Sequence, residues 1–409
     1  MSSTWSFAGY IKHGWQAENV IAAQAAVPVK VAENRYLTVY ALLDIRGHDS
    51  CCGVVGELRA GSPAGEVKQH VVIAPGGNEC RFFDDDAELY FRCVGQPQVF
   101  GSAKLNLWVV KYYIYAHKFQ NGVLNNPCSV NWSGRPHAAA DSLRLYTVQL
   151  SYDAANDAIK IVEPESRVIT GNNVFDSCSS NHALTPPAAL NEDNTEFVEL
   201  VTFTPRGEGL HGTGSHGKVA PVHWKFDEKT HRYKVYRTGE WYQIDDFIGE
   251  ASVVKTPQGD FIASLRSFGH SGEIVLCRTP DLFAGYGKLV RHKGTCTPRT
   301  LYCSSDGTVH LFTNIDWISP YKHERNPLYE FIIDEDLNLS APETVFDAAN
   351  LPFNTPFADM AKYCEIAPEH EMLLCRVIDL SQTAGNMGFP PITEEGVAAS
   401  GIYVFERKK

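Results

Sequence analysis

The chain has 409 residues, a formal net charge of −12, and 44% hydrophobic and 11% aromatic residues. Proteins hold phosphate backbones and anionic lipids through clustered Lys and Arg, so this charge excludes general binding to nucleic acid or to an anionic membrane surface. No run of about 18 apolar residues could span a bilayer, and the segment Met1–Trp15 lacks the basic and apolar parts of a signal peptide.

Short runs rich in Val, Ile, Tyr, Phe and Thr, bounded by Gly, Pro, Asn or Asp, follow one another along the chain and predict β-strands. In chain order they are Tyr36–Leu43, Gly53–Leu58, Gln69–Ile73, Glu88–Val94, Leu105–Tyr115, Ser142–Leu150, Phe197–Thr204, Arg232–Arg237, Ala251–Lys255, Phe261–Arg266, Glu273–Cys277, Thr308–Asn314, Leu328–Ile333, Met372–Ile378 and Gly401–Phe405. No amphipathic helix of ordinary length interrupts them. The sequence therefore predicts an all-β protein.

The clearest repeating unit runs from Gly249 to Leu289 and has the strand and turn order of one blade of a β-propeller. Similar units can be drawn at Val27–Leu58, Asn78–Gln98, Pro136–Ile169, Pro186–Tyr242, Pro298–Val345 and Met360–Phe405. This predicts seven blades, with six or eight left open, in a single domain over residues 1–409. We expect Trp5–Ile11 to pair with Ile402–Phe405, closing the ring and protecting both edges.

One motif lies in the clearest unit. Glu250 opens a strand run, the turn Pro257–Asp260 follows, and Arg266 ends the next run. This arrangement resembles the sialidase-type propeller families, in which a Glu opens the innermost strand of a blade and an Arg ends the next strand, both facing a central pocket. The resemblance implies that Glu250 is catalytic and that Arg266 binds substrate. The alternative is that the two residues form a salt bridge within the blade.

Three more residues are expected at the same pocket. Arg299, in the turn Thr297–Thr300, resembles the start of the next blade, which implies an Arg near the same pocket. The sialidase nucleophile is a Tyr backed by a Glu, and Tyr321 is the candidate for it. His270 follows Arg266 in the loop Gly269–Gly272, and we expect it at the same pocket.

A second resemblance is to the propeller polysaccharide lyases and rhamnosidases that act on uronate-containing glycans. Those enzymes place a His at the pocket end of a strand. Here the run Tyr36–Leu43 continues into Arg46 and His48, so the resemblance implies that His48 is catalytic and that Arg46 binds substrate. The partner His expected before this strand is absent.

Further histidines precede strand runs, where propeller loops turn towards the axis, and one of them has an Arg beside it. Arg135 and His137 stand before one run, and His182 before another. For any one of the 15 histidines taken alone, a packed or solvated side chain is the commoner case. Their gathering in turns favours a shared site, with His137 as a second catalytic candidate and with Arg135 and His182 binding substrate.

These residue types suit β-elimination at a uronate. An Arg neutralises the carboxylate, a His or Tyr takes the C5 proton, and an acid protonates the leaving oxygen. We therefore expect a lyase acting on an acidic oligosaccharide, with Arg266 and Arg299 at the carboxylate, His48 or His137 as the base, and Tyr321 or another His returning the proton.

Two alternatives stay open. A sialidase-like or rhamnosidase-like hydrolase would use Glu250, with Asp44, Asp49 or Asp316 as the acid. A non-catalytic propeller would bind a glycan or a protein on its face. No motif indicates a cofactor or a metal site, and a structural Ca²⁺ has no supporting signal. The 11 scattered cysteines fit reduced thiols, so we expect a cytoplasmic protein, or a secreted one whose leader has been removed.

Overall fold

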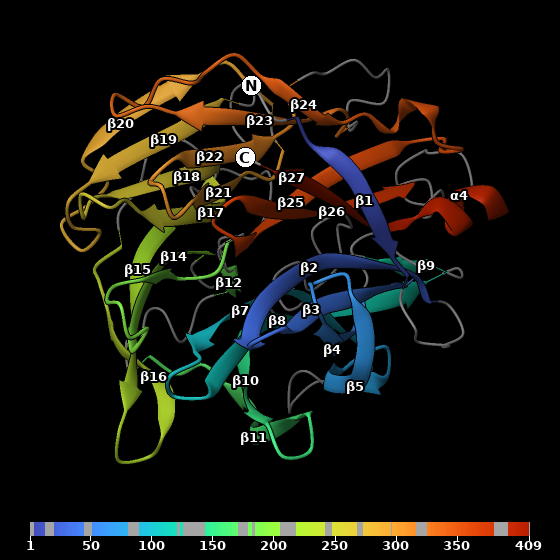
Figure 1. Cartoon of the computed structure of the whole chain (residues 1–409), viewed down its shortest axis with the longest axis horizontal. Helices are drawn as coiled ribbons and strands as arrows, with labels where there is room; N and C mark the ends of the chain where they lie inside the picture. The colour runs from blue at the N-terminus through green and yellow to red at the C-terminus, as the bar shows by residue number, and fades with distance from the viewer. Residues whose placement is uncertain are drawn as a thin grey trace.

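The computed structural model describes residues 4–12, 20–44, 51–80, 90–120, 123–125, 144–170, 179–181, 185–204, 218–241, 248–267, 273–295, 297–315, 325–379 and 392–408. Within these ranges the chain is mainly antiparallel strands, and each strand run predicted from the sequence overlaps an observed strand. The sheets follow one another in chain order around a common centre, which is the architecture of a β-propeller (Figure 1).

The N-terminal part of the chain contributes one ten-stranded sheet that contains two antiparallel meanders. The first meander is β2 (Val20–Ala32), β3 (Arg35–Asp44), β4 (Cys51–Ala60) and β5 (Glu66–Pro75). The second is β7 (Tyr90–Ser102), β8 (Leu107–Gln120), β10 (Arg144–Asp153) and β11 (Ala158–Arg167), with β6 (Glu79–Cys80) beside β7 and β9 (Val123–Asn125) beside β8. A parallel bridge between Cys52 and Val94 joins the two.

Four separate sheets, each a blade, follow. Their strands are β12 (Ser179–Asn181), β13 (Ala188–Ala189), β14 (Glu196–Thr204), β15 (Lys218–Asp227) and β16 (Arg232–Thr238); β17 (Ile248–Lys255), β18 (Phe261–Ser267), β19 (Ile274–Thr279) and β20 (Lys288–His292); β21 (Thr300–Cys303), β22 (Val309–Thr313), β23 (Leu328–Ile333) and β24 (Glu343–Phe346); and β25 (Pro356–Ala367), β26 (His370–Asp379), β27 (Gly401–Lys408) and β1 (Ser6–Ile11). The described ranges also contain the helices η1 (Ala348–Asn350) and α4 (Glu394–Ala399). No helix in the described ranges has the length and apolar character needed to cross a membrane.

The predicted number of seven blades is wrong. We expected separate units at Asn78–Gln98 and Pro136–Ile169, but β7 pairs with β8 and β8 pairs with β10, so both belong to one meander. The long segment between β8 and β10 has the length and composition of a blade boundary, although the strands on its two sides are hydrogen-bonded neighbours.

The N-terminal strand pairs as expected. Tyr10 lies opposite Tyr403 and Ile11 opposite Ile402, so β1 is the fourth strand of the last blade and covers the edge of β27. Figure 1 shows this strand, in blue, against the red end of the chain. The further expectation, that this pairing closes the ring of blades, stays a prediction.

Apolar side chains fill the spaces between neighbouring sheets. The ring of Phe100 lies 5.0 Å from that of Phe197 and 5.4 Å from that of Trp224, which joins the second meander to the next blade. Another cluster packs Leu374 of the last blade against Tyr40 of the first meander. Each large apolar side chain buried in this way contributes about 1.5–3 kcal/mol, so the inter-sheet clusters hold the strands that carry the central charges.

Candidate functional site

Charged side chains gather where the first strand of a blade begins and the second strand ends. Antiparallel pairing brings these two ends together in every blade. Glu250 lies near the start of β17, and Arg266 lies near the end of β18. Asp359 and Arg376 hold the corresponding places on β25 and β26, where they lie directly opposite each other. Two blades therefore present an acid and an arginine at the same end.

Glu250 and Arg266 form a buried ion pair through Oε2 and Nη1. Strand β17 has one extra residue, relative to β18, between Ile248 and Ala251. This bulge places Glu250 opposite Arg266. Their side chains are 8% and 10% exposed. Both residues lie at strand ends, as the sequence predicts. The observed ion pair also matches the alternative drawn from the sequence, a salt bridge within the blade.

Asp359 accepts hydrogen bonds from two arginines. Arg376 donates from Nε to Oδ1 at 2.7 Å and from Nη2 to Oδ2 at 2.8 Å, and its Nη1 donates to Gln24 of β2 at 2.7 Å. Burial alone would raise the pKa of Asp359, but the charges of Arg376 and Arg325 outweigh burial and lower that pKa to about 2. The carboxylate is therefore ionised at neutral pH.

Arg325, just before β23, is the second partner of Asp359. Its Nη1 lies 2.8 Å from Oδ2, and its side chain is 18% exposed against 1% for Asp359. Burial lowers the pKa of Arg325, and Arg266 and Arg376 lower it further against the attraction of Asp359. This coupling shows that the charges of the two blades lie close enough to act on one another.

Lys362 is the unexpected member of this group. It is 2% exposed, and the charges acting on it include those of Glu250 and Asp359. Strand β25 has one extra residue between Asp359 and Lys362. These two residues are three apart in sequence, whereas their partners on β26, Arg376 and Leu374, are two apart. Because residues two apart share a face of a strand, Asp359 and Lys362 also share one, although their spacing of three would otherwise separate them.

The same irregularity recurs in three inner strands. Ala25 of β2, Gln96 of β7 and Met360 of β25 have φ values of 53°, 43° and 50°, each beside a register shift. Positive φ is usual for Asn34 in the hairpin turn after β2, but it is costly for these side chains inside a strand. Bulges change which side chains of a strand share a face, and they are common beside functional sites.

We name six residues the central cluster: Glu250, Arg266, Arg325, Asp359, Lys362 and Arg376. Four are basic and two are acidic, so this part of a chain with a net charge of −12 has an excess of cations. In the described residues, no three His, Cys, Asp or Glu side chains are grouped as metal ligands. The excess of basic side chains suits the cluster to hold an anion.

Arg299 stands directly before β21 and is 1% exposed. Its Nη1 donates to the carbonyl of Leu265 at 3.2 Å, and its Nη2 donates to that of Thr295. Leu265 immediately precedes Arg266. The described contacts of Arg299 therefore support the end of β18.

The other predicted site residues lie outside the described part of the chain. They are Arg46, His48, Arg135, His137, His182, His270 and Tyr321, together with the candidate acids Asp49 and Asp316. Asp44 is described: it ends β3, is 2% exposed and pairs with Val20 at the start of β2. Because Gln24 near that start contacts Arg376, Asp44 belongs to the same end of the propeller.

Sequence reasoning missed Arg325, Asp359, Lys362 and Arg376. A signal existed for Arg376, which stands near the end of a predicted strand as Arg266 does. Asp359 was one residue outside the predicted unit Met360–Phe405. Lys362 had no signal, because a Lys in a strand usually faces solvent and a bulge cannot be located from composition.

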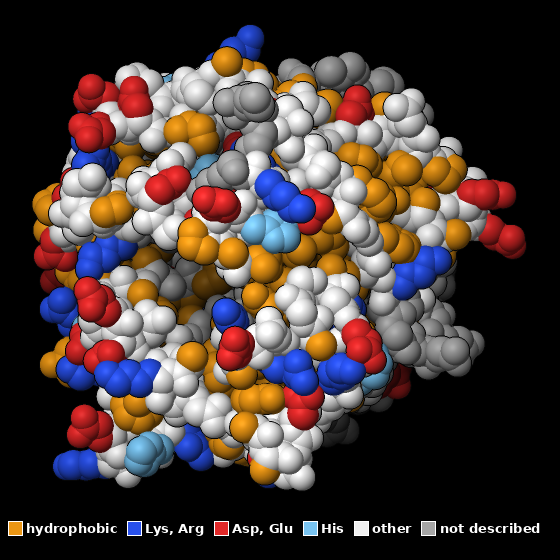
Figure 2. Space-filling model, in the orientation of Figure 1, with side chains coloured by type: hydrophobic (Ala, Val, Ile, Leu, Met, Phe, Trp, Pro, Cys, Tyr) orange, Lys and Arg blue, Asp and Glu red, His pale blue; other side chains and the backbone are white. Residues whose placement is uncertain are grey.

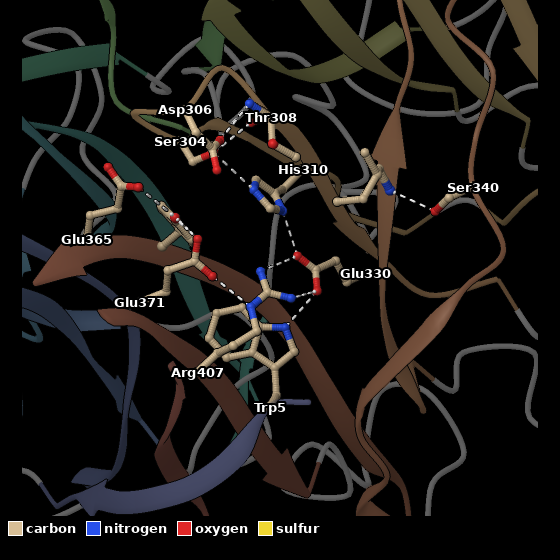
Figure 3. A network of polar contacts seen from close by, with 12 residues as sticks. Trp5, Ser304, Asp306, Thr308, His310, Glu330, Ser340, Glu365, Glu371 and Arg407 are labelled. Carbon is tan, nitrogen blue, oxygen red and sulfur yellow. Dashed lines mark hydrogen bonds and ion pairs between the residues drawn. The ribbon is translucent and has the colours of Figure 1, made fainter. Parts of the chain in front are cut away.

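A second buried polar network lies between the last two blades (Figure 3). His310 contacts Glu330 at 2.6 Å through Nδ1 and Ser304 Oγ at 3.4 Å through Nε2, which resembles a Ser, His and acid arrangement. Ser304, however, donates to Asp306 Oδ1 at 2.5 Å and is 3% exposed. The carbonyl of Thr308 is a second acceptor for the Ser304 hydroxyl, at 3.1 Å, and both acceptors are nearer than His310, so these contacts form a structural turn.

Solved structures resemble this chain at low sequence identity. Trypanosoma rangeli sialidase in complex with the inhibitor DANA is 9% identical with a TM-score of 0.56, and the match covers 100% of this chain and 60% of that one. The intramolecular trans-sialidase from Ruminococcus gnavus in complex with oseltamivir carboxylate is 10% identical with a TM-score of 0.56, covering 100% and 97%. A protein of unknown function from Dyadobacter fermentans is 10% identical with a TM-score of 0.55, covering 98% and 97%.

No protein-family model and no curated protein matches the chain. At identities near 10% the likeness shows the fold alone. It agrees with the β-propeller fold expected from the sequence. It does not bear on the resemblance to lyases and rhamnosidases.

Proposed function

We propose that the protein cleaves or transfers a glycosidic bond of an acidic sugar at the central cluster. The observation that carries this proposal is Arg325. Its Nη1 donates to Asp359, and no described hydrogen bond uses its Nε or Nη2, although the guanidinium also lies 5.0 Å from the centroid of the Phe357 ring. Its side chain is also the most exposed of those in the cluster's ion pairs, at 18%. A guanidinium fork of this kind matches a carboxylate in two parallel hydrogen bonds.

Glu250 supports hydrolysis or transfer as the reaction. A glutamate side chain can act as nucleophile or base towards a sugar, and Asp44 is the described candidate for the acid. The β-elimination route expected from the sequence needs His48, His137 or Tyr321, which lie outside the described ranges. The described histidines with polar contacts instead meet other groups, as His310 meets Glu330 and His223 meets Glu196. Glu250 is therefore the described residue on which we base hydrolysis or transfer as the proposed reaction.

The test is a turnover assay on sialylated and uronate-containing oligosaccharides, following reducing ends and the ultraviolet absorbance of unsaturated uronates together. We expect reducing ends without absorbance, and at least about a 100-fold loss of kcat in Glu250→Gln. Glu228→Gln, at an exposed turn, is the matched control and should keep full activity.

A rise in absorbance would show β-elimination and contradict the proposed reaction. Unchanged activity in Glu250→Gln would remove Glu250 from the mechanism. No turnover of any substrate, with binding intact, would favour the non-catalytic propeller.

A further inference from the structure

Lys362 occupies a place that ordinary folding rules disfavour. Lysine is rarely buried, and here the residue is 2% exposed, so its ammonium group has lost nearly all contact with water. The bulge that carries it costs further free energy, because Met360 has a φ of 50°. A strained bulge that delivers a buried charge to a site is an observation that points to function.

The surroundings of Lys362 determine how its charge acts. Glu250 on β17 and Asp359 on β25 attract it. The remaining described charges of the central cluster are the guanidinium groups of Arg266, Arg325 and Arg376, on β18, before β23 and on β26. Burial is the largest influence, and it lowers the pKa of Lys362 from 10.5 to about 7 despite the two carboxylates. The three arginines stay charged throughout this range, so Lys362 is the cation of the cluster whose charge changes near neutral pH.

We propose that Lys362 is a positioning residue that sets the affinity of the central cluster for acidic sugars, strengthening binding when it is protonated and weakening binding when it is neutral. This inference rests on the proposed function, because it takes a carboxylate sugar as the ligand. It goes further by naming the residue that makes recognition depend on pH. Lys362 acts through Glu250 and Asp359. When Lys362 is charged it balances the negative charge of these carboxylates, so the positive charge of the arginines attracts the ligand more strongly.

Calorimetric titration with N-acetylneuraminic acid and with glucuronic acid, from pH 5.5 to 8.5, tests this directly. Both ligands stay ionised in that range, because free carboxyl groups titrate at about pH 4 or below. We expect the wild type to bind several-fold to about tenfold more tightly at pH 6 than at pH 8. Lys362→Met should bind weakly with this pH dependence lost, and Lys362→Arg should bind tightly at both pH values. The methyl ester of each sugar is the uncharged control and should bind weakly throughout.

Other groups titrate in the same window, histidines above all. The decisive comparison is therefore between the wild type and Lys362→Met. An unchanged pH dependence in Lys362→Met, or in Lys362→Gln if the Met variant does not fold, would overturn the proposal.

A second measurement needs no ligand. Because the pKa of Lys362 is lower in the folded chain than in the unfolded chain, the unfolded chain binds an extra proton between about pH 7 and pH 10. The free energy of unfolding of the wild type, relative to Lys362→Met, should therefore rise with pH across that range.

The two measurements separate the possible failures. Absence of sugar binding at every pH, with the stability difference present, would overturn the acidic-sugar ligand while showing that Lys362 titrates. Sugar binding without the stability difference would overturn the role of Lys362 and leave the proposed function standing.

Discussion

Gln96 is a single residue at which a bulged strand carries conformational strain. It has a φ of 43° inside β7, and its side-chain Oε1 is buried without a hydrogen-bond partner in the described structure. Glycine adopts positive φ without steric cost. We therefore expect Gln96→Gly to raise the free energy of unfolding by about 1 kcal/mol, measured by urea denaturation. Gln98→Gly, two residues along the same strand, is the matched control and should lower it. A loss of stability in Gln96→Gly would mean that the strain has been overestimated.

At the scale of elements, the polar network between the last two blades ties the N-terminal segment to the propeller. Trp5 Nε1 donates to Glu330 Oε2 at 2.7 Å, and Arg407, from the last strand, donates to Glu330 and lies over the Trp5 ring at 4.2 Å (Figure 3). Burial raises the pKa of Glu330, but the hydrogen bonds from His310 and Arg407 outweigh it and lower that pKa. The carboxylate is thus held ionised and depends on each of its donors.

Trp5→Phe removes one of these donors while keeping an aromatic ring. We expect the free energy of unfolding to fall by about 1–3 kcal/mol, because a buried carboxylate loses a hydrogen bond. Trp241→Phe is the matched control: Trp241 is 44% exposed, and its replacement should change stability by less than about 0.5 kcal/mol. Equal effects of the two substitutions in thermal or urea denaturation would show that the network does not secure the N-terminal segment.

The strands themselves could be predicted, because alternating β-branched and aromatic residues between turn residues are a local signal. Glu250 and Arg266 were predictable because they sit at ends of such strands. The pairing of β8 with β10, which merges two predicted units into one meander, could not be predicted. It depends on hydrogen bonds between strands that are separated by a long segment of the sequence. Lys362 could not be predicted either, because one extra residue in a strand reverses the face that a side chain takes and leaves no mark in the composition.

At the scale of the whole molecule, charge is distributed unevenly. The chain carries a net charge of −12, while the central cluster has four basic and two acidic side chains. On the face shown in Figure 2, acidic and basic side chains are interspersed and the surface is hollowed near its centre. A cationic centre in an acidic protein recruits a small anionic ligand without retaining nucleic acid or anionic lipid, which require extended basic surfaces.

The central claim is that the cluster binds the carboxylate of a sugar. A crystal structure with N-acetylneuraminic or glucuronic acid bound tests this most directly. We predict the sugar carboxylate within hydrogen-bonding distance of the Arg325 guanidinium, about 2.7–3.2 Å, with the sugar ring beside Glu250. A sugar bound elsewhere on the propeller, with Arg325 still directed only at Asp359, would contradict the account.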